Sequence, residues 1–104
     1  MKMYKILYLP LAKKDLSDIV FYLTDECKAP EVAANLLDEL NFAIQRLERF
    51  PYSCRVYHSV PLLEDEHRIL LVKNYAVFYV VEENTVEIRR IIHAKRDLPK
   101  IIMT

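Results

Sequence analysis

The run YAVFYVV, at residues 75–81, is apolar on both sides of any β-strand that it forms. Alternate side chains of a strand point to opposite faces of the sheet. One face receives Tyr75, Val77, Tyr79 and Val81, and the other receives Ala76, Phe78 and Val80. Each face of the sheet must then be covered by another part of the chain, or it remains partly open as an apolar patch.

Neighbouring strands are predicted directly before and after this run. HRILLV, at residues 67–72, leads into it through Lys73-Asn74, and VEIRRIIH, at residues 86–93, follows the polar residues 82–85. Short polar turns between β-rich runs indicate an antiparallel meander. A further strand is predicted near the start of the chain, at residues 3–9.

Two amphipathic helices are predicted in the N-terminal half. The first begins at Pro10 and extends to about residue 26, with an apolar stripe of Ala12, Leu16, Ile19, Val20 and Leu23. The second begins at Pro30, and its stripe comprises Ala33, Leu37, Leu40, Ile44 and Leu47. It should end before Phe50, because Pro51 disfavours helix in the residue before it. The helices should form an antiparallel hairpin, and residues 51–66 should form a long loop.

This order, β-α-α-β-β-β, predicts an α+β fold with the helical hairpin on one face of a mostly antiparallel four-stranded sheet. If every connection reverses the chain, the strands alternate in direction from the first to the last. We expect a single domain of residues 1–104, with a short C-terminal tail that packs through Leu98, Ile101 and Ile102.

The chain contains no glycine, which excludes a glycine-rich phosphate loop and a Rossmann dinucleotide site. Its turns should therefore use Asn, Asp and Pro. Cys27 and Cys54 fit no metal or redox spacing, and His58, His67 and His93 fit no ligand motif, so no metal or other cofactor is expected.

No apolar run reaches membrane-spanning length, and the first residues do not have the pattern of a signal peptide. A cytoplasmic protein without a membrane partner is therefore expected.

The last predicted strand and the residues after it carry many cations. Residues 86–97 contain Arg89, Arg90, His93, Lys95 and Arg96 against Glu87 and Asp97, although the formal net charge of the chain is zero. We expect these cations at the face and end of the sheet that the helices leave open, balanced by acids on the helices. Arg89 and Arg90 should point to opposite faces, and one of them is a candidate to pair with Glu82, Glu83 or Glu87.

Three segments of the chain resemble the RelE/ParE superfamily of bacterial toxins, the toxic components of type II toxin–antitoxin (plasmid stabilisation) modules. They are PLAKKDLSDIVFYL, HRILLVKNYAVFYVV and VEIRRIIHAKRD, and they occur in the family's order over nearly the whole chain. The resemblance implies a helical hairpin on an antiparallel sheet. It also implies a growth inhibitor that a cognate antitoxin protein neutralises by wrapping around it.

The resemblance implies two alternative activities. RelE-like members cleave mRNA in the ribosomal A site without a metal, and the corresponding catalytic candidates are Arg68, His93 and Arg96. ParE-like members instead poison DNA gyrase. At Ala76 the RelE-like toxins carry an arginine that contacts the scissile phosphate, and a pI near 6.8 is low for a protein that enters a site made of RNA. ParE-like inhibition of gyrase is therefore favoured, with the ribosome-dependent endoribonuclease or an inactive interaction module as alternatives.

Candidate contacts with the antitoxin or the target are Arg68, Tyr79, Arg90, Arg96 and Ile101. Arg68 and Arg96 are the strongest of these, as anion-binding groups or as anchors for acidic antitoxin side chains. Two candidates also have a structural interpretation, which the pattern favours for both. Tyr79 fits a packed core, and His93 fits a hydrogen-bonded histidine at the end of a strand. No metal site and no small-molecule substrate are expected.

Overall fold

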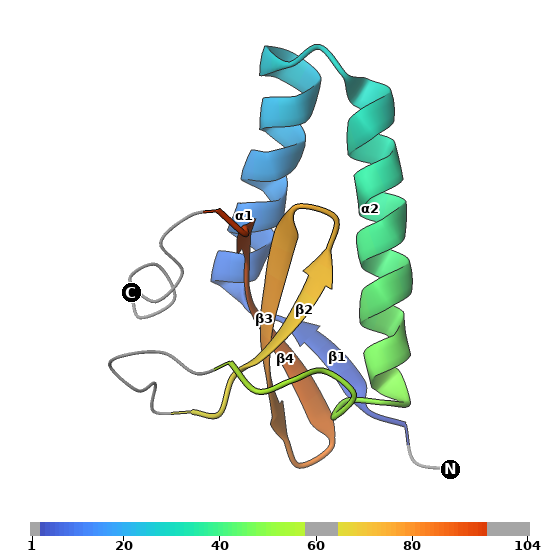
Figure 1. Cartoon of the computed structure of the whole chain (residues 1–104), viewed down its shortest axis with the longest axis vertical. Coiled ribbons are helices and arrows are strands. Elements are labelled where there is room, and N and C mark those ends of the chain that lie inside the picture. Colours follow the sequence, from blue (N-terminus) through green and yellow to red (C-terminus); the bar gives the residue numbers. More distant parts are fainter. Residues whose placement is uncertain (1–2, 58–64, 96–104) are drawn as a thin grey trace.

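The computed structural model describes residues 3–57 and 65–95 (Figure 1). Its strands are β1 (Lys5–Tyr8), β2 (Arg68–Val72), β3 (Tyr75–Glu82) and β4 (Thr85–His93). Its helices are α1 (Pro10–Phe21), which continues as the π-helix η1 (Tyr22–Glu26), and α2 (Pro30–Gln45), which continues as the 3-10 turn η2 (Arg46–Glu48). The predicted order of elements is confirmed, and both helices begin at the prolines expected to start them.

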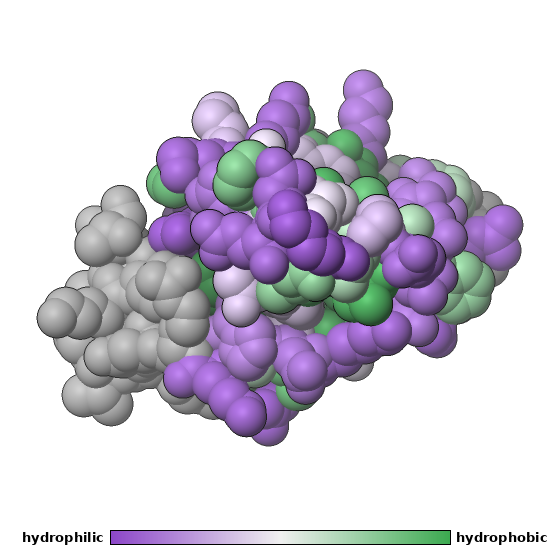
Figure 2. Space-filling view, turned by 90° about the horizontal axis from the view of Figure 1, so that it is seen from above, coloured by the Kyte–Doolittle hydropathy of each residue, from purple (hydrophilic) through white to green (hydrophobic). Residues whose placement is uncertain are grey.

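The two helices form a hairpin that packs on the sheet, and the end of the hairpin extends beyond the strands (Figure 1). Figure 2 looks onto the molecule from that end and shows hydrophobic side chains between hydrophilic ones. Within the described ranges, no helix is long and apolar enough to span a membrane.

The strands lie in the order β1-β4-β3-β2. β3 pairs antiparallel with both β2 and β4, which confirms the predicted meander. β1 instead lies parallel to β4, with Lys5 opposite Thr85 and Tyr8 opposite Ile88. The sheet is mostly antiparallel as predicted, but the expected alternation of direction is wrong for its first strand.

The parallel pair arises because the chain does not reverse where β1 meets α1. The N–H of Leu9 still donates to the carbonyl of Ile88 (3.0 Å), and α1 begins at the next residue. At Asp15 the helix already lies beside Ile91, whose backbone N–H donates to the Asp15 carboxylate (3.0 Å). α1 therefore continues along β4 in the direction of β1, and one expected reversal is missing.

Apolar side chains are buried on both faces of the sheet. On the helix side, Val77, Tyr79, Val86, Ile88 and Ile91 pack with Ala12, Leu36, Leu40, Ile44 and Leu47. Leu36 thus takes the core place that the sequence pattern gave to Leu37, which is exposed.

The opposite face has a smaller cluster of buried residues: Ile69, Ala76, Phe78 and Ile92. Tyr57 packs against this cluster, with its ring edge-on to that of Phe78 at 4.9 Å between centroids. The centre of this face is therefore covered, which is the first of the two alternatives that the sequence left open.

Part of the predicted loop lies along β2 as an ordered segment. Residues 51–57, called the strap from here on, form an antiparallel bridge between Val56 and Arg68. The N–H of Tyr57 donates to the carbonyl of His67 (2.8 Å), and the N–H of Ile69 donates to that of Arg55 (3.2 Å). The strap thus protects the first part of this edge strand from further pairing.

Three turns of the described chain place a residue other than glycine in the left-handed region. Lys28, Lys73 and Glu83 have φ angles of 54°, 54° and 51°. The turns were expected to use Asn, Asp and Pro, and Asn74 and Asn84 do follow two of these residues. The left-handed position itself is occupied by lysine or glutamate. Holding such a residue in this conformation costs roughly 1–2 kcal/mol of stability relative to glycine.

Replacing Glu83 with glycine is expected to stabilise the protein. Glu83→Gly relieves the left-handed backbone and should raise the free energy of unfolding by up to about 1 kcal/mol in urea denaturation. The matched control is Glu82→Gly, one residue earlier at the end of β3, where glycine should destabilise by roughly 0.5–1 kcal/mol. Equal losses of stability in the two variants would contradict this interpretation of the turn.

Candidate functional site

Arg68, at the start of β2, is bound to the strap. Its Nη1 donates to the carbonyl of Cys54 (2.6 Å), and its Nη2 lies 3.4 Å from Oε1 of Glu66. The guanidinium carbon lies 5.0 Å from the centroid of the Tyr52 ring, a cation–π distance. Only 16% of the Arg68 side chain is exposed, so its present contacts hold the strap in place.

Tyr79, on β3, also holds the strap in place. The side chain is fully buried, and its hydroxyl donates to the carbonyl of Pro51 (2.8 Å). Burial raises the pKa of the Tyr79 phenol, so the group remains a neutral donor. These contacts agree with the core role that the sequence indicated. We therefore do not assign Tyr79 to a surface that contacts a partner.

Arg90 and Asp15 connect β4 to α1. The Arg90 Nε and Nη2 donate to the two carboxylate oxygens of Asp15, at 2.7 and 3.0 Å. The backbone N–H of Ile91 donates to the same carboxylate. The hydrogen bond to Asp15 raises the pKa of Arg90, and the two side chains are only 15% and 11% exposed. β1 ends opposite Ile88, so it does not pair with the later residues of β4. Asp15 instead accepts a hydrogen bond from the backbone of that part of β4.

The remaining cations of β4 also have partners. Arg89 donates to Oε1 of Glu87 (2.8 Å) and lies 3.2 Å from Oδ2 of Asp65, so one predicted pairing with a nearby glutamate is confirmed. His93 accepts at Nδ1 from the N–H of Lys95 (3.2 Å), and its ring lies edge-on to Tyr75 at 5.4 Å. His93 therefore has the contacts expected of a structural histidine at a strand end.

The strand register places Arg68 and His93 at opposite corners of the sheet. Arg68 lies opposite Tyr79, whereas His93 lies opposite Tyr75. Four residue steps of about 3.3 Å and two strand spacings of about 4.8 Å put their Cα atoms roughly 16 Å apart. The structure therefore does not bring these two catalytic candidates together. Arg96 and Ile101 lie outside the described residues.

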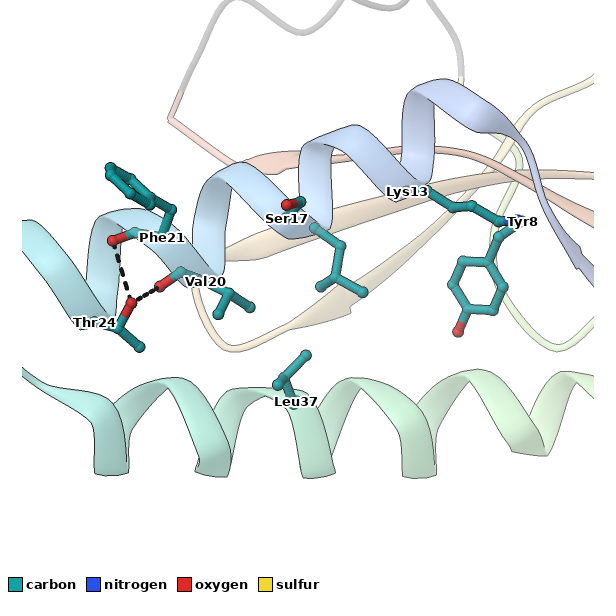
Figure 3. Close-up of a pocket in the computed structure, with 8 residues that line it drawn as sticks. Tyr8, Lys13, Ser17, Val20, Phe21, Thr24 and Leu37 are labelled. Carbon is teal, nitrogen blue, oxygen red and sulfur yellow. Dashed lines mark hydrogen bonds between the residues drawn. The ribbon is translucent and has the colours of Figure 1, made fainter.

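An open apolar groove lies between α1 and α2 and was not predicted from the sequence. It measures about 650 Å³, and Leu16, Val20 and Leu37 line it together with Tyr8 at one end. Figure 3 shows Val20 and Leu37 pointing toward each other from the two helices. The sequence feature that could have indicated this groove is the apolar stripe of the second helix. The stripe is wide enough to provide side chains for both the core and the groove.

The groove is suited to binding an apolar segment, because its lining surface is mostly apolar. Lys13, Ser17 and Thr24 belong to the α1 side, and Asp38 and Asn41 border its continuation on α2. Among the described residues, no group of three or more His, Cys, Asp and Glu side chains is placed to hold a metal ion.

Comparison with known proteins identifies the sequence family. Residues 6–98 match the family model described as the ParE toxin of the type II toxin–antitoxin system parDE. No curated protein matches the chain.

Two solved structures have the same fold. The chain is similar to one from a chromosomal ParDE TA system of P. aeruginosa, with a TM-score of 0.73 and 17% identity over 89% of this chain and 98% of that one. It is also similar to a chain of the toxin–antitoxin complex RelBE2 from Mycobacterium tuberculosis, with a TM-score of 0.60 and 19% identity over 88% of this chain and 98% of that one. At such identities the likeness concerns the fold alone.

Removing the Asp15 carboxylate should strongly destabilise the protein. Asp15→Ala leaves the Arg90 guanidinium without its carboxylate and the Ile91 N–H without its acceptor. We expect the free energy of unfolding in urea to fall by about 2–4 kcal/mol. The matched control is Asp18→Ala on the next turn of α1, which removes only the exposed pair with Lys14. Similar effects of the two substitutions would contradict the role given to Asp15.

Removing the Arg68 side chain should loosen the strap without unfolding the sheet. In Arg68→Ala, the amides of Tyr57 and Ile69, which join the strap to β2, should exchange with solvent about tenfold faster. Hydrogen exchange followed by NMR measures both positions. The control is Arg55→Ala, an exposed arginine of the strap itself. Unchanged exchange in Arg68→Ala would mean that the strap does not depend on Arg68.

Proposed function

Because the chain belongs to the ParE toxin family of type II toxin–antitoxin systems, we propose that it stops growth by inhibiting DNA gyrase. A cognate antitoxin neutralises it, and both proteins act in the cytoplasm. The toxin domain spans residues 1–104 and needs no cofactor.

The separation of Arg68 and His93 is the main support for inhibition by binding. Groups that cleave a phosphodiester must act within hydrogen-bond reach of the same few atoms. Here the two candidates stand at opposite corners of the sheet, roughly 16 Å apart by strand geometry. Arg68 is also engaged by Cys54 and Glu66.

Ala76 and the charge distribution also support gyrase over the ribosome. Ala76, where RelE-like toxins carry a phosphate-binding arginine, is fully buried in the smaller apolar cluster. Residues 10–48 carry eight carboxylates and four basic side chains, a net charge of −4. Such a surface is repelled by RNA, whose binding depends largely on neutralising phosphates.

The groove between α1 and α2 supports the antitoxin partner. A mostly apolar groove of about 650 Å³ fits an apolar segment of another protein. The ParDE and RelBE2 structures with the same fold come from toxin–antitoxin systems. We therefore assign the groove to the cognate antitoxin, whose gene we expect beside that of the toxin.

Ribosome-dependent mRNA cleavage remains the second candidate, because the resemblance matches Arg68 and Arg96 to basic residues that RelE-like toxins use. An inactive module of the same fold is the third. A supercoiling assay and primer extension on mRNA distinguish both candidates from inhibition of gyrase.

Purified toxin should inhibit supercoiling by purified gyrase, and the product of the adjacent gene should restore it. In induced cells, primer extension should find mRNA uncut, because Arg68 and His93 do not converge. Arg68→Ala should then retain inhibition. Codon-positioned cuts with normal supercoiling would replace this proposal with the ribosome-dependent one. Normal supercoiling, uncut mRNA and unimpaired growth would favour the inactive module.

A further inference from the structure

A basic patch lies where α2 ends, at the opposite end of the helices from the hairpin turn (Figure 1). Residues 46–55 carry three arginines and one glutamate, a net charge of +2. Residues 10–45, by contrast, carry seven carboxylates and three basic side chains, a net charge of −4. The molecule is therefore neutral as a whole but polarised along its helices. We call Arg46, Arg49, Phe50, Tyr52 and Arg55 the basic patch.

The arginines of the patch are available to a partner. Arg46, Arg49 and Arg55 are exposed, and none of them takes part in an ion pair within the described residues. Arg46 begins η2, and side chains three residues apart eclipse one another in a 3-10 turn, so Arg46 and Arg49 project on the same side. These arginines therefore differ from those of β2 and β4, whose guanidinium groups are engaged within the molecule.

Two aromatic rings accompany the arginines. Phe50 is 54% exposed and Tyr52 57%. The N–H of Phe50 donates to the carbonyl of Arg46 (3.0 Å), and the N–H of Ser53 donates to that of Phe50 (3.2 Å), so consecutive turns connect the rings to the arginines. The ring of Tyr52 lies edge-on to that of Tyr4, at 6.4 Å between centroids. The patch is therefore held in shape before a partner binds, which lowers the entropic cost of binding.

This combination of side chains is suited to nucleic acid. Arginines neutralise phosphates, and proteins that follow a nucleic-acid strand combine a positively charged surface with aromatic side chains that contact the bases. An acidic protein segment would also pair with the arginines, and it is the alternative that an experiment must exclude. The proposed target favours nucleic acid, because gyrase holds DNA while it acts.

We infer that the basic patch contacts the DNA that gyrase holds, with its arginines on the phosphates and its aromatic rings against the sugars and bases. The inference rests on the proposed function and adds DNA to the surface that the toxin recognises. The acidic hairpin opposes binding to free nucleic acid, so the contact forms where gyrase has already brought DNA and toxin together. The DNA is retained in the complex, in keeping with the poisoning of gyrase that the resemblance implies.

Binding to gyrase with and without DNA tests the contact. Fluorescently labelled wild-type toxin should bind the gyrase–DNA complex about tenfold more tightly than gyrase alone in an anisotropy titration. Arg46→Ala with Arg49→Ala should bind gyrase alone like the wild type and should lose most of this preference. The matched control, Lys14→Ala with Lys28→Ala, removes two exposed cations of the hairpin and should keep the preference. Thermal unfolding confirms that each variant is folded.

Photocrosslinking identifies what the patch touches. Phe50→p-benzoylphenylalanine places a photoreactive ring in the patch, and Phe21→p-benzoylphenylalanine places one at a 59% exposed position near the hairpin turn. After irradiation of the toxin with gyrase and radiolabelled DNA, position 50 should crosslink to DNA and position 21 should not. Crosslinks from position 50 to a gyrase subunit alone would assign the patch to a protein contact and overturn the inference.

The outcomes separate this inference from the proposed function. If wild-type toxin leaves supercoiling intact, the proposed function fails and the inference fails with it. If the wild type inhibits supercoiling but binds gyrase equally with and without DNA, gyrase remains the target and only the DNA contact is overturned. If the arginine variant binds gyrase and gyrase–DNA more weakly by the same factor, the arginines contact gyrase itself. If that variant binds gyrase–DNA normally but no longer binds the antitoxin, the patch belongs to the antitoxin interface. Each of the last two results also overturns the inference.

Discussion

Asp15 accepts hydrogen bonds from Arg90 and from the backbone of Ile91 at the place where β1 ends. Beyond Ile88, β4 would otherwise present unpaired backbone groups and a largely buried cation at the edge of the sheet. The carboxylate satisfies both and fixes α1 against β4. The direction of α1, and with it the position of the hairpin and the groove, depends on this contact.

Three arginines of the sheet are engaged inside the molecule, whereas the carboxylates of Asp25, Glu26 and Glu31, at the turn of the helical hairpin, are exposed. Arg68 holds the strap, Arg89 pairs with Glu87, and Arg90 pairs with Asp15. These acids face water and give that end of a neutral molecule a negative field. A polarised molecule of this kind discriminates between partners by charge, and its acidic end approaches a basic protein more readily than a nucleic acid.

Local patterns in the sequence determined the elements. Helical spacing and the prolines at positions 10 and 30 predicted both helices, and the run at 75–81 predicted apolar side chains on both faces of the sheet. These features depend on neighbouring residues, so the chain reveals them directly. The sequence also identified the candidate cations, but it did not predict most of the residues with which they pair.

Tertiary structure decided how those elements combine. The parallel pairing of β1 and the role of Asp15 rest on a contact between residues 75 positions apart. The choice of Leu36 over Leu37 for the core depends on how the hairpin is rotated on the sheet, and the separation of Arg68 from His93 depends on strand register. Sequence periodicity gives the face on which a side chain lies, but pairing between distant segments decides what that face meets.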